Sequence, residues 1–155
     1  MNQKLSDWAG IAEIVSGIAI VFTLVFLFLG IRENTNITRA AVYRDSVDSL
    51  NALDSLIAQD PELTNIWTQY QRRDTASLDE LETRRLVLLA AQLFRILETT
   101  YFNQQYGLFG ESEWDRWETT ICSHYEGARL MQVTQFVATG VTAEFMEYME
   151  SSCQV

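Results

Sequence analysis

The chain has 155 residues, a formal net charge of −10 and a sequence pI near 4.4. A surface this acidic repels phosphate backbones, so the composition argues against nucleic-acid binding. Once an N-terminal apolar segment is set aside, the remaining length is enough for one compact domain and too short for two.

A transmembrane helix is predicted over residues 8–31. The eighteen residues from Ile14 to Ile31 carry no charge, and their polar side chains are those of Ser16 and Thr23. As a helix they would span about 27 Å, close to the hydrocarbon thickness of a bilayer. A cleavable signal peptide would have a shorter apolar core and a small-residue cleavage site, and a buried core helix this apolar is unusual in a small domain. We therefore expect residues 1–7 to be a short extracytoplasmic tail.

Small side chains share one face of this predicted helix, because the helical period places their positions within a single arc around the helix axis. The residues of this small-residue face are Ala9, Ala12, Ser16, Ala19, Thr23 and Gly30. Small residues let helices approach closely in lipid, which predicts a homo-oligomer; a chance alignment is the alternative. Glu13 lies beside the face, where it either extends to the headgroups or, in a ring of helices, forms the charged constriction of a pore.

Basic residues on either side of the span predict its orientation. Those that follow it are Arg32, Arg39 and Arg44. Lys4 and the amino terminus precede it, so the positive-inside rule places the C-terminal domain in the cytoplasm. Cys122 and Cys153 are then expected to be reduced thiols; a domain on the oxidising side, held by a Cys122–Cys153 disulfide, is the alternative.

A juxtamembrane amphipathic helix is predicted over residues 32–59. No proline occurs before Pro61 and no glycine occurs between Gly30 and Gly107, so nothing in this stretch breaks a helix. Its apolar residues share one face and are Tyr43, Val47, Leu50, Leu53 and Ile57. We expect this face to pack against the core of the domain that follows.

The domain of residues 60–155 is predicted to be an all-α bundle of about five to six helices. Asp60 and Pro61 are typical of a helix start. Ser77 and Glu80 form a capping-box pattern that would open a long helix. The nearly continuous apolar run over residues 86–97 predicts that this helix is the central, buried one.

Glycines and capping residues divide the rest of the domain. Gly107 is expected to end the central helix, and Ser112 with Asp115 to cap the next one. Gly127 is expected to break that helix, and Thr142 to cap a last short one.

Two charged residues interrupt the central helix. Arg95 and Glu98 lie three residues apart among apolar neighbours, which is the spacing of a side-chain pair on one helix face. We expect a buried ion pair that sets the register of the helix, because a buried charge has to be paired. A small polar pocket for a ligand is the alternative.

Several short motifs resemble those of one protein family. They are Gly30-Ile31-Arg32-Glu33-Asn34-Thr35, Asp60-Pro61-Glu62-Leu63, the central-helix residues Arg95, Glu98, Tyr101 and Phe102, then Gly107-Leu108 and Trp114. On these residues the chain is similar to a large bacterial family of uncharacterised small proteins, with one N-terminal membrane helix that closes in Ile-Arg-x-Asn-Thr. The resemblance implies a bacterial inner-membrane protein and brings no activity with it.

The remaining residues give little sign of catalysis. His124 is the one histidine, and it lies two positions after Cys122, so on a helix the two side chains point apart and share no ligand face. We predict no metal, no cofactor and no catalytic residue. The expected function is a non-catalytic, single-pass membrane protein that self-associates through its transmembrane and juxtamembrane helix, as a scaffold or an oligomeric pore, with an unidentified membrane protein as a further partner.

A second function is the alternative to this one. Membrane-anchored helical ribonucleases of defence systems use an arginine and a histidine spaced by a few residues. The nearest candidates here are Arg116 and His124, whose spacing is too long for that motif. A ribonuclease-like accessory protein is still the alternative function, because the architecture is similar even though the motif is not matched.

Overall fold

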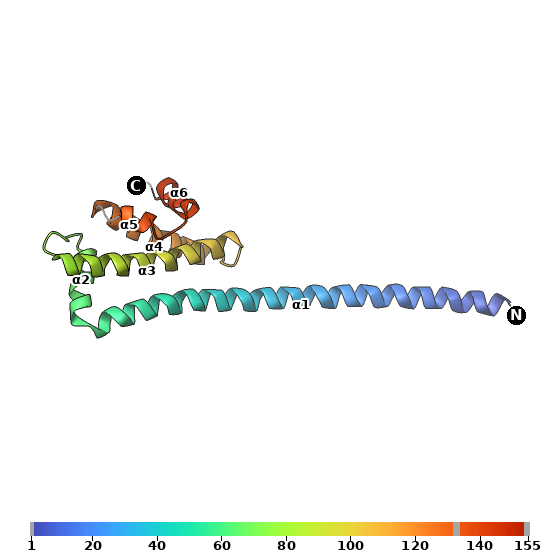
Figure 1. The fold of residues 1–155 in the computed structure, drawn as a ribbon. Helices are drawn as coiled ribbons and strands as arrows, with labels where there is room; N and C mark the ends of the chain where they lie inside the picture. The colour runs from blue at the N-terminus through green and yellow to red at the C-terminus, as the bar shows by residue number, and fades with distance from the viewer. Residues whose placement is uncertain (1, 132–133, 154–155) are drawn as a thin grey trace. The chain divides into compact units, whose positions relative to one another are not determined.

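The computed structural model describes residues 2–131 and 134–153, with side chains at Glu13, 15–131, Thr134 and 137–153. This part of the chain is helical and contains no strand, which confirms the predicted all-α class (Figure 1). Its helices are α1 (Asn2–Gln59), α2 (Pro61–Gln71), α3 (Glu80–Gln105), α4 (Glu111–Leu130), α5 (Thr134–Ala138) and α6 (Ala143–Ser152). The chain divides into two units, Met1–Ala40 and Ala41–Val155.

Helix α1 is continuous over 58 residues, so the predicted transmembrane and juxtamembrane segments belong to one helix. It passes through the polar stretch at residues 34–36 without interruption. There the hydroxyls of Thr35 and Thr38 donate to the carbonyl oxygens four residues earlier, at 2.9 Å in both cases. These bonds satisfy the hydroxyls within the helix, although they share carbonyl oxygens with the backbone N–H groups of the helical ladder.

The core of the second unit forms around α3, which in Figure 1 lies between the last turns of α1 and the layer of α4, α5 and α6. Leu53 and Ile57 of α1 are buried in this core, as the amphipathic pattern predicts. The largest fully buried side chains are Phe94, Phe145, Leu53, Ile66, Leu86, Leu97, Ile121, Met149 and Val137. The central position of α3 is confirmed, although its outer face reaches solvent at Leu88.

The start of α2 is as predicted, and the start of α3 is not. Asp60 caps α2, and Pro61 is its first residue. Helix α3 is capped by Asp79 in place of Ser77: Asp79 Oδ1 accepts from the backbone N–H of Glu82 at 2.8 Å, and Glu82 accepts from the N–H of Asp79 at 2.9 Å. A capping box is present, but it lies two residues later than the sequence predicts.

Helix α4 also begins and ends differently from the prediction. Gly110 is its N-cap, and the carboxylate of Glu113 accepts from the Gly110 backbone N–H at 2.8 Å, so Ser112 and Asp115 do not cap it. Gly127 does not break the helix, which continues to Leu130. A single glycine costs about 1 kcal/mol inside a helix, and tertiary packing outweighs that cost where the residue is buried, as Gly127 is.

Two other boundaries are confirmed. Gly107 has φ +68°, the left-handed conformation that ends a helix and that glycine adopts without strain. Thr142 caps α6, with its hydroxyl oxygen accepting from the N–H of Phe145 at 3.4 Å. Phe145 and Met149 face the core, and their burial attaches this ten-residue helix to the bundle.

Candidate functional site

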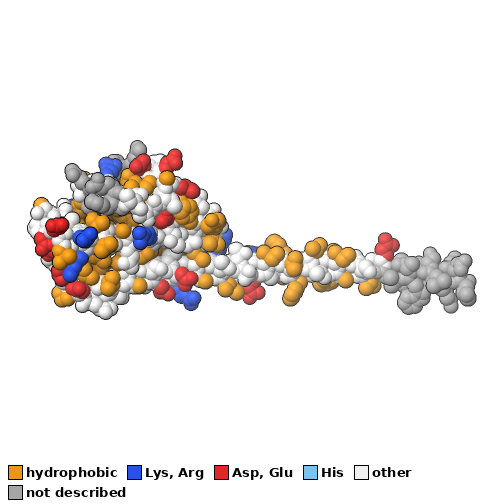
Figure 2. All heavy atoms as spheres, in the orientation of Figure 1, with side chains coloured by type: hydrophobic (Ala, Val, Ile, Leu, Met, Phe, Trp, Pro, Cys, Tyr) orange, Lys and Arg blue, Asp and Glu red, His pale blue; other side chains and the backbone are white. Residues whose placement is uncertain are grey.

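The apolar part of α1 is uncovered in the described chain. Every valine, isoleucine, leucine and phenylalanine from Val15 to Ile31 is more than half exposed, and Phe26 reaches 80%. Figure 2 shows their side chains along this segment. The helix is long and apolar enough to cross a membrane, and none of its most apolar window is buried. An uncovered apolar surface of this extent is typical of a segment that contacts lipid or another protein.

The small-residue face of α1 is exposed wherever its side chains are described. Ser16, Ala19, Thr23 and Gly30 are all exposed, whereas the side chains of Ala9 and Ala12 lie outside the described residues. The hydroxyl of Thr23 donates to the carbonyl oxygen of Ala19 at 2.8 Å, so this polar group is satisfied within its own helix. A methyl group placed on Gly30 would meet nothing within 4 Å. The face is therefore open to a second helix, and Glu13 beside it is exposed too.

The predicted buried pair of Arg95 and Glu98 is wrong. Arg95 is exposed and Glu98 is half-buried, and each bonds the segment that precedes α6. The Nε of Arg95 donates to the carbonyl oxygen of Gly140 at 3.4 Å, and a Glu98 carboxylate oxygen accepts from the backbone N–H of Thr142 at 2.5 Å. Both charges keep contact with water while satisfying backbone groups, which avoids the desolvation that a buried pair would require.

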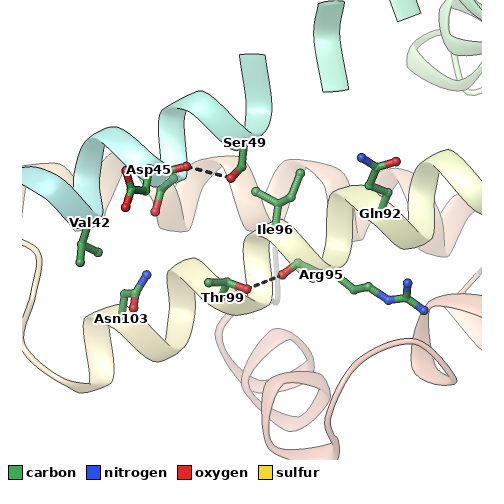
Figure 3. A pocket seen from close by; sticks show the side chains of 9 residues that line it. Val42, Asp45, Ser49, Gln92, Arg95, Ile96, Thr99 and Asn103 are labelled. Atoms are coloured by element: carbon green, nitrogen blue, oxygen red, sulfur yellow. Dashed lines mark hydrogen bonds between the residues drawn. The ribbon is translucent and has the colours of Figure 1, made fainter. Parts of the chain in front are cut away.

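A groove runs between α1 and α3, with a volume of about 460 Å³. Polar side chains dominate both walls (Figure 3): Asp45, Ser46 and Ser49 from α1, and Gln92, Arg95, Thr99 and Asn103 from α3. Val42 and Ile96 lie among them. The hydroxyls of Ser49 and Thr99 donate to carbonyl oxygens of their own helices, at 2.8 and 2.9 Å. The guanidinium of Arg95 points away from Asp45, so the two charges do not pair across the groove.

A second, more apolar cavity of about 350 Å³ shares Gln92 with this groove. Leu56, Leu63, Leu88 and Leu89 line it. At its edge, Arg85 forms an ion pair with Glu62 at 2.5 Å. The α1–α3 side of the domain thus combines hydrogen-bonding groups with exposed leucines, which is a composition that suits a protein partner.

His124 lies in a cavity of about 200 Å³ that also includes Tyr70 and Arg73. The Tyr70 hydroxyl donates to the backbone carbonyl oxygen of His124 at 3.3 Å, and their rings are nearly parallel with centroids 6.2 Å apart. Burial lowers the pKa of His124 and raises the pKa of Tyr70 to about 12. Both rings are therefore uncharged at neutral pH.

The arginine of this cavity is Arg73, and the predicted candidate Arg116 does not line it. Arg73 follows α2 with φ 58°, and its side chain pairs with Glu126 at 3.1 Å. The Glu126 carboxylate offsets the positive charge that binding of an RNA phosphate would need, so the cavity does not favour a ribonuclease-like function.

Cys122 and Cys153 are joined in a disulfide, so the expectation of two separate thiols is wrong. Their Cα atoms are 4.9 Å apart. Cys122 belongs to α4, and Cys153 is the C-cap of α6, so the bond ties the end of the last helix to the bundle. Nothing in the sequence reveals that α4 and α6 lie side by side, so spacing alone could not decide between this bond and two separate thiols.

No group of three or more histidine, cysteine, aspartate or glutamate side chains that could hold a metal ion is found within the described ranges. No family model, curated protein or solved structure matches the chain. The candidate functional features of the described chain are its uncovered apolar helix, the α1–α3 groove and the His124 cavity.

Sequence reasoning missed the α1–α3 groove, although one signal for it was present. Gln92, Ile96, Thr99 and Asn103 recur at intervals of four, three and four residues, which places them on one face of α3. It also missed Arg73, which is 51 positions before His124 in the sequence and lines the same cavity, where Tyr70 of α2 packs against His124 of α4.

Proposed function

We propose that this protein is a single-pass membrane protein that self-associates through α1 and presents its helical domain as a scaffold for a membrane protein partner. The family resemblance suggests the bacterial inner membrane. The observation that carries the proposal is the stretch from Val15 to Ile31, whose large apolar side chains are all more than half exposed. Removing one such side chain from water is worth about 1.5–3 kcal/mol, so twelve of them favour lipid strongly over solvent.

The open small-residue face of α1 supports self-association. Helices in lipid gain little from the hydrophobic effect and depend on close backbone approach, which small side chains allow. Ala19 and Gly30 are the described residues of this face with the least side-chain bulk. A second copy of α1 could approach there, and the polar groups of Ser16 and Thr23 would face the same interface.

The α1–α3 side of the domain supports a scaffold over an enzyme. Its groove has hydrogen-bonding groups on both walls and shares Gln92 with the cavity that the exposed Leu56 and Leu88 line. Such a mixture of polar and apolar contacts is typical of protein recognition. The His124 cavity is smaller, and its one arginine is already paired.

Membrane fractionation and detergent mass measurement test the proposal. The full chain should stay with carbonate-washed membranes and should have the mass of an oligomer in mild detergent. Ala19→Ile with Gly30→Ile should shift it toward monomer. Val21→Ile with Val25→Ile, on the opposite face of the helix, should leave the mass unchanged. A strict wild-type monomer would contradict self-association.

Conductance distinguishes a pore from a scaffold. In planar bilayers a scaffold should give no unitary currents. Currents that change in selectivity with Glu13→Gln would instead support a charged constriction and the pore form of the proposal.

A further inference from the structure

The contacts between α4 and α6 hold Cys122 and Cys153 in a fixed register. One helical turn before the disulfide, the hydroxyl of Tyr148 donates to a carboxylate oxygen of Glu118 at 2.8 Å. Glu118 precedes Cys122 by four residues, and Tyr148 precedes Cys153 by five, so both links join the same two helix faces. Phe145 and Met149 of α6 are fully buried in the core as well. The two cysteines therefore meet because the helices are already aligned.

The environment of the pair is that of a structural bond. Cys153 is only 7% exposed and belongs to the hydrophobic core, with Cys122 packed against it. Redox-active and metal-binding cysteines are usually accessible or clustered with further ligands, and no such cluster occurs in the described residues. The chain has two cysteines in all, so no other pairing competes.

We propose that the Cys122–Cys153 disulfide forms in the cell and that the domain of residues 41–155 lies on the oxidising, extracytoplasmic side of the membrane. Structural disulfides persist in oxidising compartments and are rare in a reducing cytosol. This rests on the proposed membrane span, and it reverses the orientation that the basic residues predict.

The charge bias that opposes this orientation is small. The three arginines that follow the span, Arg32, Arg39 and Arg44, stand against two positive groups before it, Lys4 and the amino terminus. A difference of one charge is a weak determinant, because positive residues act collectively and the fold of a translocated domain also contributes. The disulfide is the more specific observation, since it involves both cysteines of the chain.

Formation of the bond requires an oxidant. Each thiol loses a proton and one electron, and the two electrons pass to a protein disulfide of a dithiol oxidoreductase in that compartment, which becomes a dithiol. The exchange proceeds through a mixed disulfide with one of the two cysteines. The better exposed of the two, Cys122, is the one that we expect to react first.

Thiol trapping tests the bond in intact bacterial cells that express the full chain. Cells are quenched in acid and the chain is denatured, and free thiols, buried ones included, are then blocked with N-ethylmaleimide. The chain is next reduced, and the new thiols are labelled with a polyethylene-glycol maleimide. We expect two heavy labels per wild-type chain. The Cys153→Ser variant should carry none, because its remaining thiol is blocked in the first step. A wild-type chain without label would overturn the proposal.

Reporter fusions at the C-terminus test the compartment independently. A fused alkaline phosphatase should be active, and a fused green fluorescent protein exported through the same route should be dark. A fluorescent fusion with inactive phosphatase would overturn the orientation, whether or not the disulfide is present. Release of the chain by carbonate would contradict the membrane span itself, and the trapping result would then still decide whether the bond forms.

Discussion

A carboxylate oxygen of Glu98 accepts a hydrogen bond from the backbone N–H of Thr142, 2.5 Å away and 44 residues later in the chain. Thr142 is the N-cap of α6, so this bond connects the central helix to the start of the last one. Arg95, one turn earlier on α3, bonds the carbonyl oxygen of Gly140 in the same segment. Arg95 and Glu98 of α3 thus position α6, a role that their spacing does not reveal.

Removal of the Glu98 carboxylate should destabilise the domain. We expect Glu98→Ala to cost about 1–2 kcal/mol, because the Thr142 N–H loses a charged acceptor. Glu98→Gln keeps an acceptor oxygen and should cost less. Asp115→Asn, a carboxyl-to-amide change at an exposed site, is the control and should have almost no effect. Urea unfolding of the full chain in detergent measures all three; equal effects at both sites would contradict the assigned role.

The cap of α3 gives a second prediction. Asp79→Ala should lower the unfolding free energy by about 0.5–2 kcal/mol, since it removes the acceptor for the Glu82 N–H. Ser77→Ala should cost less, because the Ser77 hydroxyl donates to the half-buried side chain of Gln69, at 2.6 Å, whereas Asp79 is the N-cap of α3. Thermal unfolding of the two variants, compared with wild type, checks the order. A larger loss of stability for Ser77→Ala than for Asp79→Ala would instead support the capping box that the sequence predicts at Ser77.

Arg73 occupies a position that usually favours glycine, at φ 58° after the end of α2. Arg73→Gly should be at least as stable as wild type, because relief of the left-handed strain offsets the loss of an exposed ion pair worth about 0–1 kcal/mol. Arg73→Ala keeps the strain and loses the pair, so it should be less stable than Arg73→Gly by about 1 kcal/mol. Chemical unfolding of both variants measures this difference, and an alanine variant as stable as the glycine variant would contradict it.

The disulfide should contribute strongly to stability. It closes a loop with a sequence separation of 31, for which loop-closure entropy predicts about 3.7 kcal/mol. Dithiothreitol should therefore lower the melting temperature of the purified wild-type chain. The Cys122→Ser/Cys153→Ser double variant should melt near the reduced protein and should not respond to the reductant. A wild-type melting temperature that is insensitive to full reduction would contradict the prediction.

His124 should make stability depend on pH in mildly acidic solution. Burial lowers its pKa in the folded state below the usual 6.5, with Asp54 opposing the shift to a smaller extent. The unfolded chain therefore binds more protons than the folded chain just below pH 6.5, and stability falls as the pH decreases through that window. His124→Asn should flatten the slope just below pH 6.5. An unchanged slope in the variant would assign the effect to other groups.

The course of the backbone could largely be predicted. The apolar run to Ile31, the lack of helix breakers before Pro61, the glycine at 107 and the cap at Thr142 all act within one or two helical turns. Such signals depend on local hydrogen bonds and backbone sterics, so they can be read from neighbouring residues. Where two capping residues compete within a few positions, as before α3, the local signal was not enough to choose between them.

The sequence by itself determined the helical class, the apolar segment that suits a membrane, and the amphipathic face that carries Leu53 and Ile57 into the core. Only the tertiary structure decided which residues meet: Glu98 with Thr142, Arg73 with Glu126, and Cys122 with Cys153. The physical reason is the distance along the chain over which each kind of interaction acts. Periodicity and capping are properties of one helix, whereas these partners belong to different helices and come together only when the whole core packs.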